Sequence, residues 1–194
     1  MQIEYEATFY PVKKNDVRAK LEEVGAKLIK QEFLQKRCVF RLPTGHEIKG
    51  GWLRVRDEGD KITMSLKVVD GDNIENQKEI CLKVDNFEQA VLLFESIGCE
   101  NKAYQETKRE LWDIDGVDIC IDEWPWLEPF VEVEGPSESE VKRVSELLDF
   151  DYQSAKFCSV DTLFAEKYKI PNDVFNNQTK RIVFEGENPF KENV

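Results

Sequence analysis

Charged side chains alternate with apolar ones in several short stretches of this chain, and their types suit two kinds of chemistry. In residues 3–9, Glu4 and Glu6 alternate with Tyr5 and Ala7. A period of two places successive residues on opposite faces of a β-strand, so the two carboxylates share one face. Paired carboxylates supply the hard oxygen ligands that Mg²⁺ or Mn²⁺ prefers.

Basic residues occupy one face of other stretches. Arg54 and Arg56 alternate with Leu53 and Val55, and Lys67 follows the same pattern further along the chain. Guanidinium and ammonium groups donate hydrogen bonds to phosphate oxygens. The remaining charged residues that share such faces are Arg37, Arg41, Glu79, Lys83, Asp118, Asp122, Glu132 and Glu134.

These charged faces have two interpretations. Any single row could face water, because antiparallel sheets commonly have one wet face. Taken together, however, about eight strands are enough to close a barrel. If helices cover the apolar outer face, the charged face turns inward, where buried charges need partners. The second interpretation predicts an interior that holds a polyanion together with divalent cations.

The elements that would position these residues follow from periodicity and from turn residues. Strands are expected at about 2–10, 33–42, 52–56, 62–69, 77–84, 104–113, 117–123 and 129–134. Helices are expected at about 16–24, 86–97, 137–148 and 159–167, the first capped by Asn15 or Asp16 and the second by Asp85. Hairpin-linked strands that outnumber the helices predict an α+β fold, an eight-stranded antiparallel barrel with helices packed outside. Residues 1–170 would form this domain, and residues 171–194 a tail that packs back loosely or stays mobile.

The composition excludes several classes of protein. The 194 residues carry a formal net charge of −12, which argues against general nucleic-acid binding. No apolar run is long enough for a membrane helix, and the N-terminus shows no secretory signal, so we expect a cytoplasmic protein without a membrane partner. Five cysteines without a CxxC spacing indicate reduced thiols, and with His46 as the single histidine a structural zinc site is not expected.

An opening signature and six motifs that follow it in order resemble the CYTH domain of the triphosphate tunnel metalloenzymes, over about residues 1–168. Glu4-Tyr5-Glu6-Ala7-Thr8 is similar to the ExExK signature that opens this domain. The motifs that follow are Leu53-Arg54-Val55-Arg56, Ser65-Leu66-Lys67, Lys78-Glu79-Ile80, Thr107-Lys108-Arg109, and Ile121-Asp122 with Phe130-Val131-Glu132-Val133-Glu134-Gly135. The resemblance implies an antiparallel barrel whose tunnel binds a triphosphate together with Mg²⁺ or Mn²⁺.

The resemblance also implies roles for individual residues. Carboxylates on the metal side would be Glu4, Glu6, Asp122, Glu132 and Glu134. Phosphate-binding residues would be Arg37, Arg54, Arg56, Lys67 and Arg109. Catalytic positions would be Lys67, Arg109 and Glu79, the last of which would orient a basic neighbour or a metal-bound water.

Two positions depart from the family's pattern. Thr8 stands where the signature has lysine, and Thr107 stands where a basic residue is common, with Lys108 directed outward. Threonine donates a hydrogen bond but carries no charge, which predicts a different substrate or a low rate. The leading hypothesis is a metal-dependent hydrolase of a small triphosphate, either inorganic, nucleoside or thiamine triphosphate, acting as a monomer or homodimer. The alternatives are an adenylyl cyclase that makes cyclic AMP from ATP, and a non-catalytic binder of phosphorylated ligands.

Overall fold

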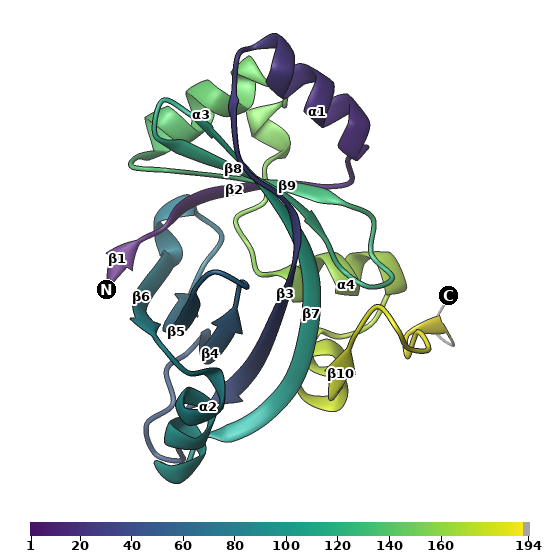
Figure 1. Cartoon of the computed structure of the whole chain (residues 1–194). Helices are drawn as coiled ribbons and strands as arrows, with labels where there is room; N and C mark the ends of the chain where they lie inside the picture. Colours follow the sequence, from purple (N-terminus) through teal and green to yellow (C-terminus); the bar gives the residue numbers. More distant parts are fainter. Residues whose placement is uncertain (192–194) are drawn as a thin grey trace.

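A single, mainly antiparallel sheet winds into a barrel in the computed structural model, which describes residues 1–191 (Figure 1). The strand order is β1-β6-β5-β4-β3-β7-β8-β9-β2, and β10 pairs with β7. The strands are β1 (Gln2–Ile3), β2 (Tyr5–Phe9), β3 (Lys27–Arg41), β4 (Gly51–Asp57), β5 (Ile62–Val69), β6 (Gln77–Val84), β7 (Glu100–Ile114), β8 (Val117–Glu123), β9 (Phe130–Gly135) and β10 (Arg181–Ile182). The predicted α+β barrel is therefore confirmed, with a ten-stranded sheet in place of eight strands.

The N-terminal segment joins the two ends of the sheet. In β1, Ile3 pairs with Lys78 of β6, whereas in β2, Tyr5 pairs with Gly135 of β9. Between them, the backbone N–H of Glu4 donates to the carbonyl of Gln77 at 2.9 Å. The stretch expected to be one strand at residues 2–10 thus changes partners at Glu4. This change nearly closes the barrel, and it accounts for one of the additional strands.

Four helices pack outside the barrel: α1 (Lys14–Glu23), α2 (Phe87–Ser96), α3 (Glu138–Leu147) and α4 (Val160–Tyr168). Two predicted caps are wrong. Helix α1 begins two residues earlier than expected, after Lys13 and without a side-chain cap. In α2, Asn86 rather than Asp85 accepts the N–H of Gln89, at 2.8 Å, because the residue directly before the first turn is the one whose oxygen reaches it.

Much of the outward apolar face of the strands is covered by these helices, although Ile80 and Leu82 of β6 stay exposed. Near β2, β8 and β9, a core that includes Leu21, Ile119 and Val141 lies beneath α1 and α3. At the opposite end of the barrel, α2 covers Phe40 and Val55. Full burial stabilises each such side chain by about 1.5–3 kcal/mol, which fixes the apolar face outward and leaves the charged face inside.

The described part of the C-terminal tail packs against the barrel wall. Phe175 and Phe190 are buried beside α4 in a cluster of aromatic rings, and Ile182 is also buried there. Strand β10 runs parallel to β7, with Arg181 beside Tyr104. Residues 192–194 of the expected tail lie outside the described residues. Among residues 1–191, no helix combines the length and apolarity needed to cross a membrane.

Candidate active site

A cavity of about 1030 Å³ occupies the interior of the barrel. Its wall contains every residue to which the sequence assigned a role: Glu4, Glu6, Arg37, Arg54, Arg56, Lys67, Glu79, Arg109, Asp122, Glu132 and Glu134. The alternation of the strands explains the convergence, because the outward residues between them are held in the apolar cores. Most of the charged residues on these faces therefore form the inner wall of the barrel, although Arg41 and Lys83 are exposed and do not line the cavity.

Arg37 is a buried cation without a carboxylate partner among the described residues. Its Nη2 donates to Gln35 Oε1 at 2.8 Å and to Thr107 Oγ1 at 2.5 Å, and its guanidinium lies 4.9 Å from the ring centroid of Trp124. Burial lowers the pKa of Arg37 well below its usual value, and repulsion from neighbouring arginines adds to the effect. This cation is therefore held in place by neutral groups.

The neighbouring arginines are held by acidic residues. Arg54 pairs with Glu79 at 2.9 Å, and Arg56 pairs with Glu58 at 2.7 Å. Burial lowers the pKa of Arg56 to about 10, with a further contribution from repulsion by Arg54. Arg37 and Arg56 are cross-strand neighbours on β3 and β4, so the three guanidinium groups occupy one region of the wall. The Nε atoms of all three are buried without a hydrogen-bond partner within residues 1–191.

Lys67 connects the basic wall to the N-terminal carboxylates. Its Nζ lies 2.9 Å from Glu4 Oε2, and on β6 its cross-strand neighbour is Glu79. Burial raises the pKa of Glu4 to about 7, although Lys67 opposes this shift. The pKa of Glu79 moves the other way, to about 2. Its burial would raise the pKa, but Lys67, a hydrogen bond with Glu4 and the charge of Arg54 together outweigh that effect. Two adjacent carboxyl groups thus have opposite tendencies to hold a proton.

Arg109 is fixed by two carboxylates. Its Nε and Nη2 donate to the two oxygens of Asp122 at 2.8 and 2.5 Å, and Nη2 also lies 2.5 Å from Glu132. Although burial opposes ionisation, these anions raise the pKa of Arg109 well above its usual value. Burial, followed by repulsion from Glu6 and Asp122, raises the pKa of Glu132.

A row of carboxylates crosses β2, β9 and β8 on the inner face. Glu6 is the cross-strand neighbour of Glu134, which is in turn the neighbour of Asp118. Burial raises the pKa of Glu6 to about 7, and repulsion from Glu134 and Glu4 contributes. Such crowded oxygen donors fit a hard divalent cation, whose charge would relieve their repulsion. Within residues 1–191, however, no three acidic, cysteine or histidine side chains are already grouped in a metal-binding arrangement.

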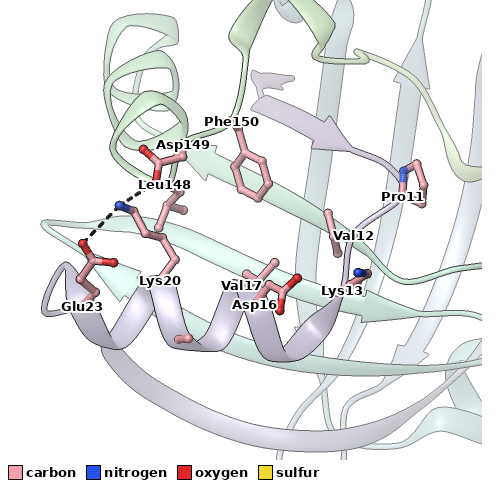
Figure 2. A pocket seen from close by; sticks show the side chains of 11 residues that line it. Pro11, Val12, Lys13, Asp16, Val17, Lys20, Glu23, Leu148, Asp149 and Phe150 are labelled. Atoms are coloured by element: carbon pink, nitrogen blue, oxygen red, sulfur yellow. Dashed lines mark ion pairs between the residues drawn. The ribbon is translucent and has the colours of Figure 1, made fainter.

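A separate hollow of about 510 Å³ lies between α1 and the end of α3 (Figure 2). Figure 2 shows Lys20 at its rim, paired with Glu23 at 3.5 Å and with Asp149 at 2.7 Å. Both of these acidic side chains are exposed, in contrast to those inside the barrel. This hollow has no buried charged group, and it contains none of the residues to which the sequence assigned a role.

The family model of the CYTH domain matches residues 2–161 of the sequence. The chain belongs to the CYTH domain family. None of the curated proteins matches the chain significantly.

Solved structures share this CYTH fold at low sequence identity. A conserved hypothetical protein from Pyrococcus furiosus is 21% identical with a TM-score of 0.68, and the match covers 82% of this chain and 99% of that one. An adenylate cyclase candidate from Vibrio parahaemolyticus is 11% identical with a TM-score of 0.71, covering 84% and 98%. An adenylyl cyclase candidate from Hippeastrum, described as having a dominant triphosphatase activity, is 14% identical with a TM-score of 0.56, covering 88% and 99%. These likenesses concern the fold alone.

The two departures from the CYTH pattern have different surroundings. Thr107 is fully buried and accepts a hydrogen bond from Arg37, so a cation from β3 reaches the position on β7 where the family commonly has a basic residue. Thr8 is also buried, and its backbone pairs with that of Lys156 in an isolated bridge. Thr8 does not line the cavity, and neither does Lys108, which lies near Glu123 and Phe184.

Sequence reasoning missed several charged residues of this CYTH cavity, among them Glu58 and Lys102. Glu58 lies in the turn after β4, and only the folded chain shows that it pairs with Arg56. Lys102 lines the cavity because of a register shift between β3 and β7, where Val39 pairs with Ala103 but the next residue pairs with Asn101. A bulge of this kind redirects a side chain, so simple alternation gives no signal for it.

Proposed function

We propose that this protein is a metal-dependent phosphohydrolase that acts on a small molecule containing a triphosphate. The observation that carries the proposal is the group of three buried arginines whose Nε atoms have no hydrogen-bond partner among the described residues. Leaving a buried hydrogen-bond donor unsatisfied costs about 1–3 kcal/mol, and more where the group is charged. Phosphate oxygens would satisfy these donors, and their negative charge would offset the mutual repulsion of the guanidinium groups.

The charge distribution supports a small anion as the ligand. The whole chain has a net charge of −12, which disfavours long polyanions such as nucleic acids at the outer surface. Inside the barrel, by contrast, Arg37, Arg54, Arg56, Lys67 and Arg109 line one cavity. A triphosphate can enter such an enclosed basic region, where low dielectric strengthens each contact.

Glu4, Glu6, Glu132 and Glu134, with Asp122 beside them, would hold Mg²⁺ or Mn²⁺, whose charge would neutralise the phosphate oxygens when bound. The elevated pKa values of Glu4 and Glu6 support this assignment, because they reflect carboxylates that are costly to ionise together in the free protein. Asp122 and Glu132 also hold Arg109, so they would serve two purposes.

Besides the metal ions, the protein's own cations would stabilise the negative charge that develops in the transition state. A water attacks the terminal phosphorus, the bond to the bridging oxygen breaks, and negative charge accumulates on the oxygen that leaves. Arg109 and Lys67 would face this charge, while Glu79 orients Arg54 through their ion pair. Preorganised donors of this type are commonly the largest contribution to catalysis, because they need no rearrangement during the reaction.

Product analysis tests the proposal. The purified protein is incubated with inorganic triphosphate, ATP and thiamine triphosphate, each with Mg²⁺, Mn²⁺ or a chelator, at neutral and alkaline pH. We expect release of phosphate that requires a divalent cation and is lost in Arg54→Met. Cyclic AMP with pyrophosphate would instead identify a cyclase, an outcome to be assayed because the Hippeastrum neighbour is described as a cyclase candidate with triphosphatase activity. Thermal stabilisation by triphosphate without any turnover would identify a binding protein.

A further inference from the structure

One end of the cavity differs in chemistry from the rest. At this end β3 finishes and β7 begins, and Arg41 joins the two by pairing with Glu100 at 2.9 Å. Arg41 also donates to Asn177 of the tail at 2.6 Å. Besides Lys102, the cavity wall near this end contains an indole and side-chain amides: Trp52, Asn172, Asn176 and Asn177.

The tail amides are oriented by a buried acid. Asp161 accepts hydrogen bonds from Asn172 Nδ2 at 2.9 Å, from Asn176 Nδ2 at 2.6 Å and from the hydroxyl of Ser159. Its carboxylate is therefore satisfied inside the wall. Within residues 1–191, the side-chain carbonyl oxygens of Asn172 and Asn176 have no partner, so they remain hydrogen-bond acceptors at the cavity.

Lys102 adds a cation to this end of the cavity. It is half-buried and has no carboxylate within ion-pair distance in the described part of the chain. Burial lowers its pKa, and repulsion from Arg41 contributes, whereas Asp161 and Asp173 act in the opposite direction. A ligand group with an acceptor atom would be favoured beside this ammonium, and a cationic group would be repelled.

Trp52 provides a flat apolar surface at the same end. Alternation along β4 places it on the inner face with Arg54 and Arg56, and it lines the cavity while only half-buried. Among the described residues, no other aromatic ring stacks against it. Aromatic rings prefer offset-stacked or edge-to-face partners, so a half-buried indole that lines a cavity suits a planar ligand.

We propose that this end of the cavity is a nucleoside subsite, which makes a nucleoside triphosphate the preferred substrate. The base stacks on Trp52, Asn172 and Asn176 accept hydrogen bonds from its amino group or from ribose hydroxyls, and Lys102 donates to an acceptor atom of the nucleoside. This assignment rests on the proposed triphosphate chemistry of the same cavity. Residues 172–177 lie beyond the segment 2–161 that the family model matches.

Binding measurements separate this subsite from the phosphate site. ATP and inorganic triphosphate are titrated calorimetrically, each with Mg²⁺, into the wild type, Trp52→Leu, Trp52→Phe and Lys102→Met. Lys180→Met is the matched control, because Lys180 is exposed on the tail and does not line the cavity. We expect Trp52→Leu and Lys102→Met to weaken ATP about tenfold, as for loss of one stacked base or one charged contact, with inorganic triphosphate changed less than about twofold. Trp52→Phe should retain most of the ATP affinity.

The possible outcomes are distinct. An equal loss for both ligands would overturn the subsite and assign these residues to the phosphates. Tight binding of inorganic triphosphate with no preference for ATP would overturn the subsite and leave the proposed function intact. Failure of the wild type to bind either ligand would overturn both. Melting temperatures of all variants verify folding, and if Trp52→Leu does not fold, Lys102→Met decides the question alone.

Discussion

Asp122 holds Arg109 through two hydrogen bonds, from Nε at 2.8 Å and from Nη2 at 2.5 Å, across neighbouring strands of the barrel. The two residues are cross-strand partners, so the planar guanidinium meets the carboxylate in a forked geometry. Asp122 is almost fully buried, and Arg109 is largely so. This pair therefore sets the direction of a cation inside the cavity.

Asp122→Asn should weaken the positioning of Arg109 without creating a cavity. The asparagine side chain keeps the shape of aspartate but loses one hydrogen-bond acceptor and the negative charge. We expect a loss of about 1–3 kcal/mol in the free energy of unfolding, measured by urea denaturation, and a clear fall in kcat of any hydrolysis. Glu140→Gln is the matched control, since its pair with Arg143 is exposed and should contribute about 0–1 kcal/mol. Equal effects of the two substitutions would contradict this interpretation of the pair.

Arg37→Met should separate ligand binding from stability. Methionine removes an unpaired buried cation while it retains much of the side-chain volume, so the free protein should be as stable as the wild type or more stable. The affinity for inorganic triphosphate should fall at least about tenfold, because charge-assisted hydrogen bonds contribute about 1.5–3 kcal/mol each. Melting temperature and calorimetric titration measure the two effects. A destabilised variant that binds triphosphate normally would show that Arg37 has a structural role only.

The inner face of the barrel could be predicted because alternation depends on the local chain alone. Arg54 and Glu132 were assigned to that face from their neighbours, and the structure places both there. Lys102 could not be found in this way, because a register shift against β3 redirects it. The change of partner at Glu4 depends on contacts with both β6 and β9, which are distant in sequence.

Most of the ion pairs between inward-facing side chains could not be predicted from the sequence either. Alternation shows which side chains face inward but not which of them meet. Apart from Glu79, which was expected to orient a basic neighbour or a metal-bound water, the expectation treated carboxylates and cations as separate sets for metal and phosphate. The structure instead joins Arg109 to Asp122 and Lys67 to Glu4. Which partner an inner residue meets depends on the stagger and curvature of the barrel.

Thr107→Lys tests whether Arg37 occupies the place of a cation on β7. The new ammonium would meet the guanidinium that now donates to Thr107 at 2.5 Å, so the single variant should be strongly destabilised. The double variant Thr107→Lys, Arg37→Met should recover much of that loss. A double-mutant cycle by urea denaturation should give a coupling energy of about 1–3 kcal/mol. Additive effects would mean that the two positions do not compete for one cation.

The raised pKa values of Glu4 and Glu6 predict how stability depends on pH. Both move from about 4.5 in the unfolded chain to about 7 in the folded protein, so the folded state binds more protons between these values. Stability should therefore fall as the pH rises from 4.5 to 7, by up to roughly 3 kcal/mol for a single carboxyl of this kind. The depressed pKa of Glu79, at about 2, acts only below pH 4.5, where its contribution is lost on acidification.

Urea denaturation from pH 5 to pH 8 measures this dependence, and Glu6→Gln should flatten it because glutamine cannot ionise. At pH 8 the carboxylates repel one another most. Added Mg²⁺ or Mn²⁺ should therefore raise the free energy of unfolding of the wild-type protein, and a chelator should reverse this gain. Glu47→Gln is the control, since Glu47 lies in an exposed loop away from the cavity. A flat profile for the wild type, or an equal response of the two variants to the metal, would show that the inner carboxylates are neither strained in the free protein nor the site of cation binding.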